Sequence, residues 1–190
     1  MTGFTTFSNQ LLGKRLQVIL ELVPGATALG FLANPTNPNI GPDMANVQAA
    51  ANALGLRVQV LTASNERELE AAFANFKQQR LDVMLVGVDL WYRTKPELIA
   101  ALAARHGVIA SCEQRSFVTA GGLMSYGSDS LESQRVQGLY VARILKGERP
   151  ADLPVQQATK FEFVLNLKAA KALGLDVPTS VILRANEVIE

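Results

Sequence analysis

Short apolar runs alternate with amphipathic segments along most of the chain. Between the runs, apolar residues recur every three or four positions, as at Met44, Val47 and Ala51, which is typical of helices packed on one face. Two of the runs, Ala28 to Ala33 and Leu81 to Val88, are typical of strands buried in a parallel sheet. The four predicted strands are Ala28 to Ala33, Arg57 to Leu61, Leu81 to Val88 and Val108 to Ser111. Their spacing matches successive strand–helix units with right-handed crossovers. It predicts an α/β fold: an open, doubly wound parallel sheet in three layers, αβα.

Polar residues mark the starts of the predicted helices. Ser8 can cap the first helix, because it stands directly before a run of apolar residues at helical spacing. Asn65 with Glu68, and Thr94 with Glu97, have the spacing of capping boxes, in which the two side chains satisfy the first free backbone N–H groups of a helix. These signals support the alternation of strands and helices.

The pattern changes after Cys112. A loop leads to a short predicted strand at Leu123 to Tyr126, and then to a helix that Ser128 or Asp129 can cap. The polar, proline-bearing stretch GERPADLP, residues 147–154, follows as a linker. Beyond it we expect an extended strand, a short helix and a strand-like end.

Composition narrows the classes of function. The chain has 190 residues, 48% apolar and 18% charged, which is typical of one sizeable globular domain or of a domain with an appendage. A net charge of +1 with scattered basic residues argues against binding to nucleic acid or to an anionic membrane. No apolar stretch is long enough to span a membrane, so direct insertion is not expected. The start, MTGFTTFSNQ, lacks a basic-then-apolar leader, so with Met1 as the natural start we expect a cytoplasmic protein.

The loops after the predicted strands are the first place to look for a site, because ligands of open α/β sheets bind beyond the carboxyl ends of the strands. The loop NPTNPN, residues 34–39, offers side-chain amides, a hydroxyl and backbone N–H groups that can hold a carboxylate or a polar head group. Asparagine before proline also favours a plain turn. Both interpretations of this loop stand.

Two further loops carry candidate chemistry. Asp89 can accept an amino group, with Trp91 or Tyr92 stacking on a ligand. Alternatively, Asp89 only caps the loop and Trp91 packs on the surface. Past the fourth strand, Glu113 and Arg115 are either ligand contacts or a surface ion pair.

Enzyme motifs are missing from this sequence. The single histidine, His106, is predicted at a helix C-terminus, where it complements the helix dipole. We find no dinucleotide or phosphate-binding glycine loop, no nucleophile elbow and no spacing typical of metal ligands. The single cysteine, Cys112, is more typical of a small apolar residue than of a nucleophile. We therefore predict no enzyme, cofactor or metal, and catalysis through Asp89 or Cys112 is the least favoured alternative.

Several longer stretches resemble a known family. They are LVPGATALGFLANPTNPN, AGGLMSYG, ILKGERPADLPVQQATKFEFVLNLKAAKALGLDVP and LRANEVIE. They are similar to the substrate-binding proteins of a group of bacterial ABC uptake systems, some of which bind aromatic amino acids and related small solutes. The resemblance implies a two-lobed, periplasmic-binding-protein-like fold of type I at a periplasmic or cell-surface location. It also implies binding of a small polar or amino-acid-like solute without chemistry, and delivery to an ABC permease.

The same resemblance divides the chain. It begins about where the family crosses from its first lobe to its second, so we expect residues 7–112 to form the α/β core of the second lobe. Residues 113–150 would then be a crossover, strand and helix of an otherwise missing first lobe, and residues 151–190 a return segment that completes the second. Because an unpaired strand and an apolar helix face favour association, we expect a homodimer of this chain.

The resemblance also implies ligand-binding residues. They are Asn34, Thr36, Asn37, Asp89, Trp91, Glu113 and Tyr126. Asp89 and Trp91 depart from the family's commoner Asp-Pro-aromatic pattern, so the solute is left open. The alternative function is that of a cytoplasmic ligand-sensing domain, since effector domains of sugar-type transcription regulators share the two-lobed fold; an upstream helix-turn-helix would distinguish it.

Overall fold

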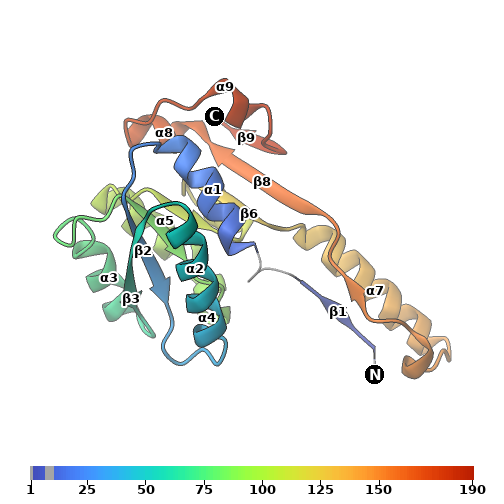
Figure 1. Ribbon diagram of the computed structural model, residues 1–190. Helices are drawn as coiled ribbons and strands as arrows, with labels where there is room; N and C mark the ends of the chain where they lie inside the picture. The colour runs from blue at the N-terminus through green and yellow to red at the C-terminus, as the bar shows by residue number, and fades with distance from the viewer. Residues whose placement is uncertain (1, 7–10) are drawn as a thin grey trace.

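A mostly parallel, seven-stranded sheet forms the body of the protein in a computed structural model that describes residues 2–6 and 11–190 (Figure 1). Across the sheet the strands are β3 (Arg57–Thr62), β2 (Ala28–Ala33), β4 (Val83–Val86), β5 (Ala110–Cys112), β6 (Met124–Ser128), β8 (Phe161–Asn166) and β9 (Glu187–Ile189). Only the β6–β8 pair among these is antiparallel. The predicted open, doubly wound sheet is confirmed.

Helices cover both faces of the sheet. One face carries α1 (Leu12–Leu22), α2 (Ile40–Ala53), α8 (Leu167–Ala172) and α9 (Thr179–Ile182), and the other carries α3 (Glu66–Ala74), α5 (Pro96–His106) and α6 (Arg115–Thr119). The strands contribute side chains to both layers in alternation. In β2, Leu29 and Phe31 pack in the layer of α1 and α2, which we call the first, and Leu32 packs in the layer of α3 and α5, the second. Successive side chains of a strand point to opposite faces, so a fully apolar strand can be buried on both. The predicted three layers are confirmed.

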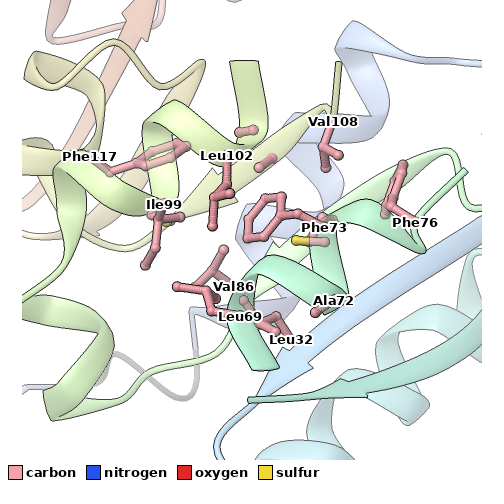
Figure 2. Packing of buried hydrophobic residues seen from close by; sticks show 14 of the residues in the cluster. Leu32, Leu69, Ala72, Phe73, Phe76, Val86, Ile99, Leu102, Val108 and Phe117 are labelled. Carbon is pink, nitrogen blue, oxygen red and sulfur yellow. The ribbon is translucent and has the colours of Figure 1, made fainter. Parts of the chain in front are cut away.

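The second layer shows how this packing works (Figure 2). Phe73 of α3 and Leu102 of α5 lie side by side over the sheet, and Val86 of β4 lies beneath them. All three side chains are at most 2% exposed. This packing fixes the end of β4, from which the chain continues to the candidate site.

A smaller unit projects from the body (Figure 1). It contains α7 (Ser130–Leu145), the short helix η1 (Pro150–Asp152) and a two-stranded parallel sheet of β1 (Phe4–Thr5) and β7 (Gln156–Gln157). The Tyr140 hydroxyl of α7 donates to the carbonyl of Pro154 at 2.8 Å. We call α7, η1, β1 and β7 the arm.

The strand predicted at Leu123 to Tyr126 is where the structure differs from the expected division of the chain. We expected it to belong to a missing first lobe, but β6 pairs with β5 on one side and β8 on the other. Its backbone groups are thus satisfied within the main sheet. Of the strand and helix that we expected in the first lobe, only the helix, α7, lies apart from the body (Figure 1).

The helix starts follow the predicted chemistry in part. The Asn65 side chain accepts the backbone N–H of Glu68 at 3.0 Å, and Asp129 caps α7 in the same way. The capping box at Thr94 is wrong, because its hydroxyl donates to the Trp91 carbonyl at 2.7 Å and α5 begins after Lys95 with Pro96 in its first turn. Ser8 lies outside the described residues.

Gly127 allows the backbone of β6 to lie close to the backbone of Glu113, the residue that follows β5. A Cβ atom at this position would overlap the backbone carbonyl oxygen of Glu113. The close approach of the two backbones therefore requires glycine. It also sets where Glu113 leaves the sheet.

We expect Gly127→Ala to lower the free energy of unfolding by about 2 kcal/mol, because the added methyl group forces the two backbones apart. The matched control is Gly138→Ala in α7, where nothing lies within 4 Å of an added Cβ; alanine there should stabilise the helix by about 0.5–1 kcal/mol. Urea unfolding monitored by circular dichroism measures both. A Gly127→Ala protein as stable as wild type would contradict the assignment.

Candidate functional site

The order of the strands reverses between β2 and β4, at the centre of the sheet: the chain continues from β2 to β3 on one side and from β4 to β5 on the other. β2 and β4 are neighbours, but α2, which follows β2, covers one face, and α5, which follows β4, covers the other. The loops after these strands therefore part from each other and leave a crevice at the carboxyl edge, the usual ligand position in such sheets. The loop of residues 34–39 follows β2, and the short helix α4 (Leu90–Arg93) follows β4.

The Asp89 carboxylate joins the two loops. One of its oxygens accepts the Asn34 side-chain amide at 3.1 Å and the backbone N–H groups of Trp91 and Tyr92 at 2.9 and 3.3 Å. The other accepts the Asn37 side-chain amide at 2.9 Å. Asp89 thus caps α4, as the plainer interpretation predicted, and is itself 8% exposed. Hydrogen bonds from four uncharged donors stabilise this buried charge.

The two asparagines also shape their own loop. The Asn34 side-chain oxygen accepts both the backbone N–H and the hydroxyl of Thr36, at 3.0 and 2.8 Å, and the Asn37 oxygen accepts the N–H of Asn39 at 2.9 Å. These are Asx turns, the local bonds that make asparagine favourable in loops. The interpretation of NPTNPN as a turn is therefore confirmed, and the same two asparagines also bind Asp89 of the neighbouring loop. Ligand binding by this loop stays a prediction.

A surface hollow of about 660 Å³ lies against these two loops. It brings together five of the predicted site residues, namely Asn34, Thr36, Asn37, Asp89 and Trp91. Leu90 lines it as well, and its side chain is 77% exposed although it is apolar. Sequence reasoning missed Leu90, because an isolated leucine in a loop gives no signal of a site.

A second hollow, of about 520 Å³, lies beside α6 and the start of α7. Glu113, another predicted site residue, lines this hollow, and Arg93 lines both. Arg93 Nε donates to Glu113 Oε1 at 2.7 Å, and this bond and charge raise the pKa of Arg93. The ion pair of Glu113 is therefore with Arg93 rather than with Arg115, whose guanidinium binds Glu187 and Glu162.

Tyr126 lies apart from both hollows. It is half-buried in β6, and its ring centroid is 6.3 Å from that of Phe163 on β8. Tyr126 is not among the described residues that line either hollow. The structure thus brings six of the seven predicted residues to two adjacent hollows.

Arg15 of α1 is a buried charge that sequence reasoning missed. It is 0% exposed, and its Nη2 donates to the Val86 carbonyl at 2.6 Å, at the end of β4. Burial lowers the pKa of this arginine, and the charge of Glu113 opposes that shift. Local spacing carries no sign of this contact, because Arg15 lies among apolar residues of α1. The contact joins α1 to β4, the strand that leads into the site.

Burial shifts the pKa values of two titratable groups near the site. Burial raises the pKa of the Cys112 thiol to about 12, so it is protonated at neutral pH, unlike an activated nucleophile. Burial also raises the pKa of Tyr92, whose hydroxyl donates to the Ala63 carbonyl at 2.8 Å. In residues 2–6 and 11–190, we find no group of three or more side chains arranged to hold a metal ion. Nor is any helix of that part long and apolar enough to cross a membrane.

An open α/β unit with a polar and aromatic hollow at its winding switch is typical of ligand-binding lobes. Comparison with known proteins gives the particular family. Residues 1–189 match the family of ABC transporter substrate binding proteins, and the chain belongs to it.

The two solved relatives agree with this chain in fold, and all three relatives extend beyond it. A conserved domain protein of Vibrio cholerae has a TM-score of 0.86 and 26% identity over 98% of this chain and 62% of its own. An ABC domain from Streptococcus pneumoniae, solved with L-Trp, has a TM-score of 0.82 and 23% identity, covering 99% of this chain and 64% of its own. A tyrosine-binding protein of Clostridioides difficile is 21% identical over 162 residues, 85% of this chain and 47% of its own. The chain thus spans about half the length of this curated relative.

We expect Asp89→Asn to lower the free energy of unfolding by about 2 kcal/mol, because either orientation of the new amide turns an NH₂ group toward a donor. The control is Asp176→Asn, an exposed carboxylate, which should change stability little. Urea unfolding measures both. Equal midpoints for Asp89→Asn and wild type would contradict the role of Asp89 as the joint between the loops.

Proposed function

We propose that this chain is the ligand-binding lobe of a solute receptor for an ABC permease, and that it binds an amino-acid-like solute with an aromatic or large apolar side chain. The observation that carries the proposal is the hollow between the NPTNPN loop and α4. Trp91 and Leu90 give it an apolar wall, and Asn37, Thr36 and Asp89 give it a polar one. Such a mixture orients a small ligand while it removes apolar surface from water.

The comparisons support this choice of ligand class. One relative is named for binding tyrosine and another was solved with L-Trp. Both ligands combine a charged amino-acid head with an aromatic side chain. In our proposal Trp91 stacks on the side chain, and the solute is bound and released without chemical change.

The proposal extends to the whole receptor. The hollow is open, and solute receptors hold their ligand by enclosing it. In our proposal a first lobe closes over the hollow, and the complete receptor acts outside the cytoplasmic membrane, where it meets its permease. This chain by itself would then bind solute weakly.

The arm supports a further part of the proposal, that two copies of this chain associate. Leu131, Leu139, Val141 and Leu145 of α7 are between 50% and 82% exposed. Apolar side chains gathered on one helix are typical of a surface that another protein element covers. In the isolated chain, a second copy of the same arm can cover it.

The first test is titration with solutes, followed by the indole N–H resonance of Trp91, which is the chain's single tryptophan. We expect L-phenylalanine to shift this resonance with a Kd of about 1 mM or weaker, since only one wall of the site is present. L-Alanine and glucose should shift it far less. Absence of any shift with aromatic amino acids would contradict the proposed function, and a micromolar Kd would contradict the incomplete site.

The second test is the oligomeric state, measured by light scattering after size-exclusion chromatography. We expect a dimer that the double variant Leu131→Lys, Leu145→Lys dissociates, because two charges in the apolar contact cannot be paired. Leu183→Lys is the control, since Leu183 is equally exposed, at 80%, but follows α9 on the main body. A monodisperse wild-type monomer would contradict the association.

A further inference from the structure

The ion pair of Arg93 and Glu113 lies where the two hollows meet. Arg93 ends α4 and lines both hollows, while Glu113 follows β5 and lines the second. Their side chains are 37% and 9% exposed, so the pair is partly removed from water but reachable. Charges in such a position interact more strongly with a ligand than fully exposed charges do.

The other charged groups of the site are already occupied. Four donors surround the Asp89 carboxylate, so a ligand's ammonium group would have to compete with them. Arg115 has its guanidinium bound to Glu187, with Glu162 close to it. Neither Asp89 nor Arg115 is therefore the best candidate to recognise a charged ligand.

Arg93 and Glu113 keep bonding capacity. Among the described residues, Arg93 makes one side-chain hydrogen bond, through Nε, and Glu113 accepts it with Oε1. The two Nη atoms of Arg93 are left to bind a carboxylate with two parallel bonds, the geometry that guanidinium favours. Glu113 Oε2 is left to accept from an ammonium group.

We propose that Arg93 and Glu113 form the subsite that recognises the zwitterionic head of an α-amino acid, with Arg93 on the carboxylate and Glu113 on the ammonium group. A free amino acid carries both charged groups on its Cα atom, so they can meet the adjacent, oppositely charged side chains of Arg93 and Glu113 together. Its side chain then extends toward Trp91 and Leu90, which line the hollow that Arg93 also lines. This inference rests on the proposed function and names the part of the solute that the site selects.

The inference predicts selection against compounds that lack one of the two charges. The probes are L-phenylalanine, phenethylamine, which lacks the carboxylate, and 3-phenylpropionate, which lacks the ammonium group. In the full 190-residue chain, titration of the Trp91 indole resonance should show L-phenylalanine binding at least about tenfold more tightly than either analogue.

Two variants separate the two contacts. Arg93→Met should abolish the preference for L-phenylalanine over phenethylamine and keep the preference over 3-phenylpropionate. Glu113→Gln should do the reverse. Arg105→Met is the matched control, because its ion pair with Glu70, at 2.9 Å, joins α5 to α3 away from both hollows. It should keep both preferences.

The outcomes distinguish this inference from the proposed function. Equal binding of the three probes by wild type, or wild-type preferences in both site variants, would overturn the subsite and leave aromatic-solute binding in place. Loss of both preferences in both variants would also overturn it, because the pair would then only hold the loops in position. Absence of binding by all three probes would overturn the subsite and the proposed function together.

Discussion

The Asp89 carboxylate is the contact on which the geometry of the candidate site depends. It receives hydrogen bonds from the loop after β2 and from the first turn of α4, two segments that are separated by more than 50 positions in the chain. Such a buried charge is stable only while its donors stay in place. These bonds hold the loop against α4, the short helix that carries Leu90, Trp91 and Arg93.

Contacts below the site give it a rigid base. Arg15 reaches from α1 to the carbonyl of Val86, so the helix that opens the body is tied to the strand that precedes Asp89. The close approach of Gly127 to the backbone of Glu113 sets the neighbouring strand end in the same way. Packed strands thus support the loops that line the hollows. Sites supported by rigid elements hold their side chains more precisely than sites on loops alone.

The body and the arm differ in how far their apolar side chains are buried. The body buries both faces of its sheet, whereas α7 keeps four apolar side chains exposed. In the family to which the chain belongs, this chain covers 47% of the curated tyrosine-binding relative and 62% of the solved Vibrio cholerae protein. These exposed side chains of α7 are the basis of the proposed association of two copies.

Local sequence patterns predicted the layers, the parallel direction of the central strands and the positions of the polar loops, because apolar periodicity and turn residues act over a few neighbouring positions. They also marked Asn34, Asn37, Asp89 and Trp91, since polar and aromatic residues at strand ends stand out against an apolar background. The tertiary structure alone decided the rest. Whether Glu113 pairs with Arg115 or Arg93, whether β6 joins the main sheet, and whether Arg15 is buried all depend on contacts between distant segments, for which local spacing carries no signal.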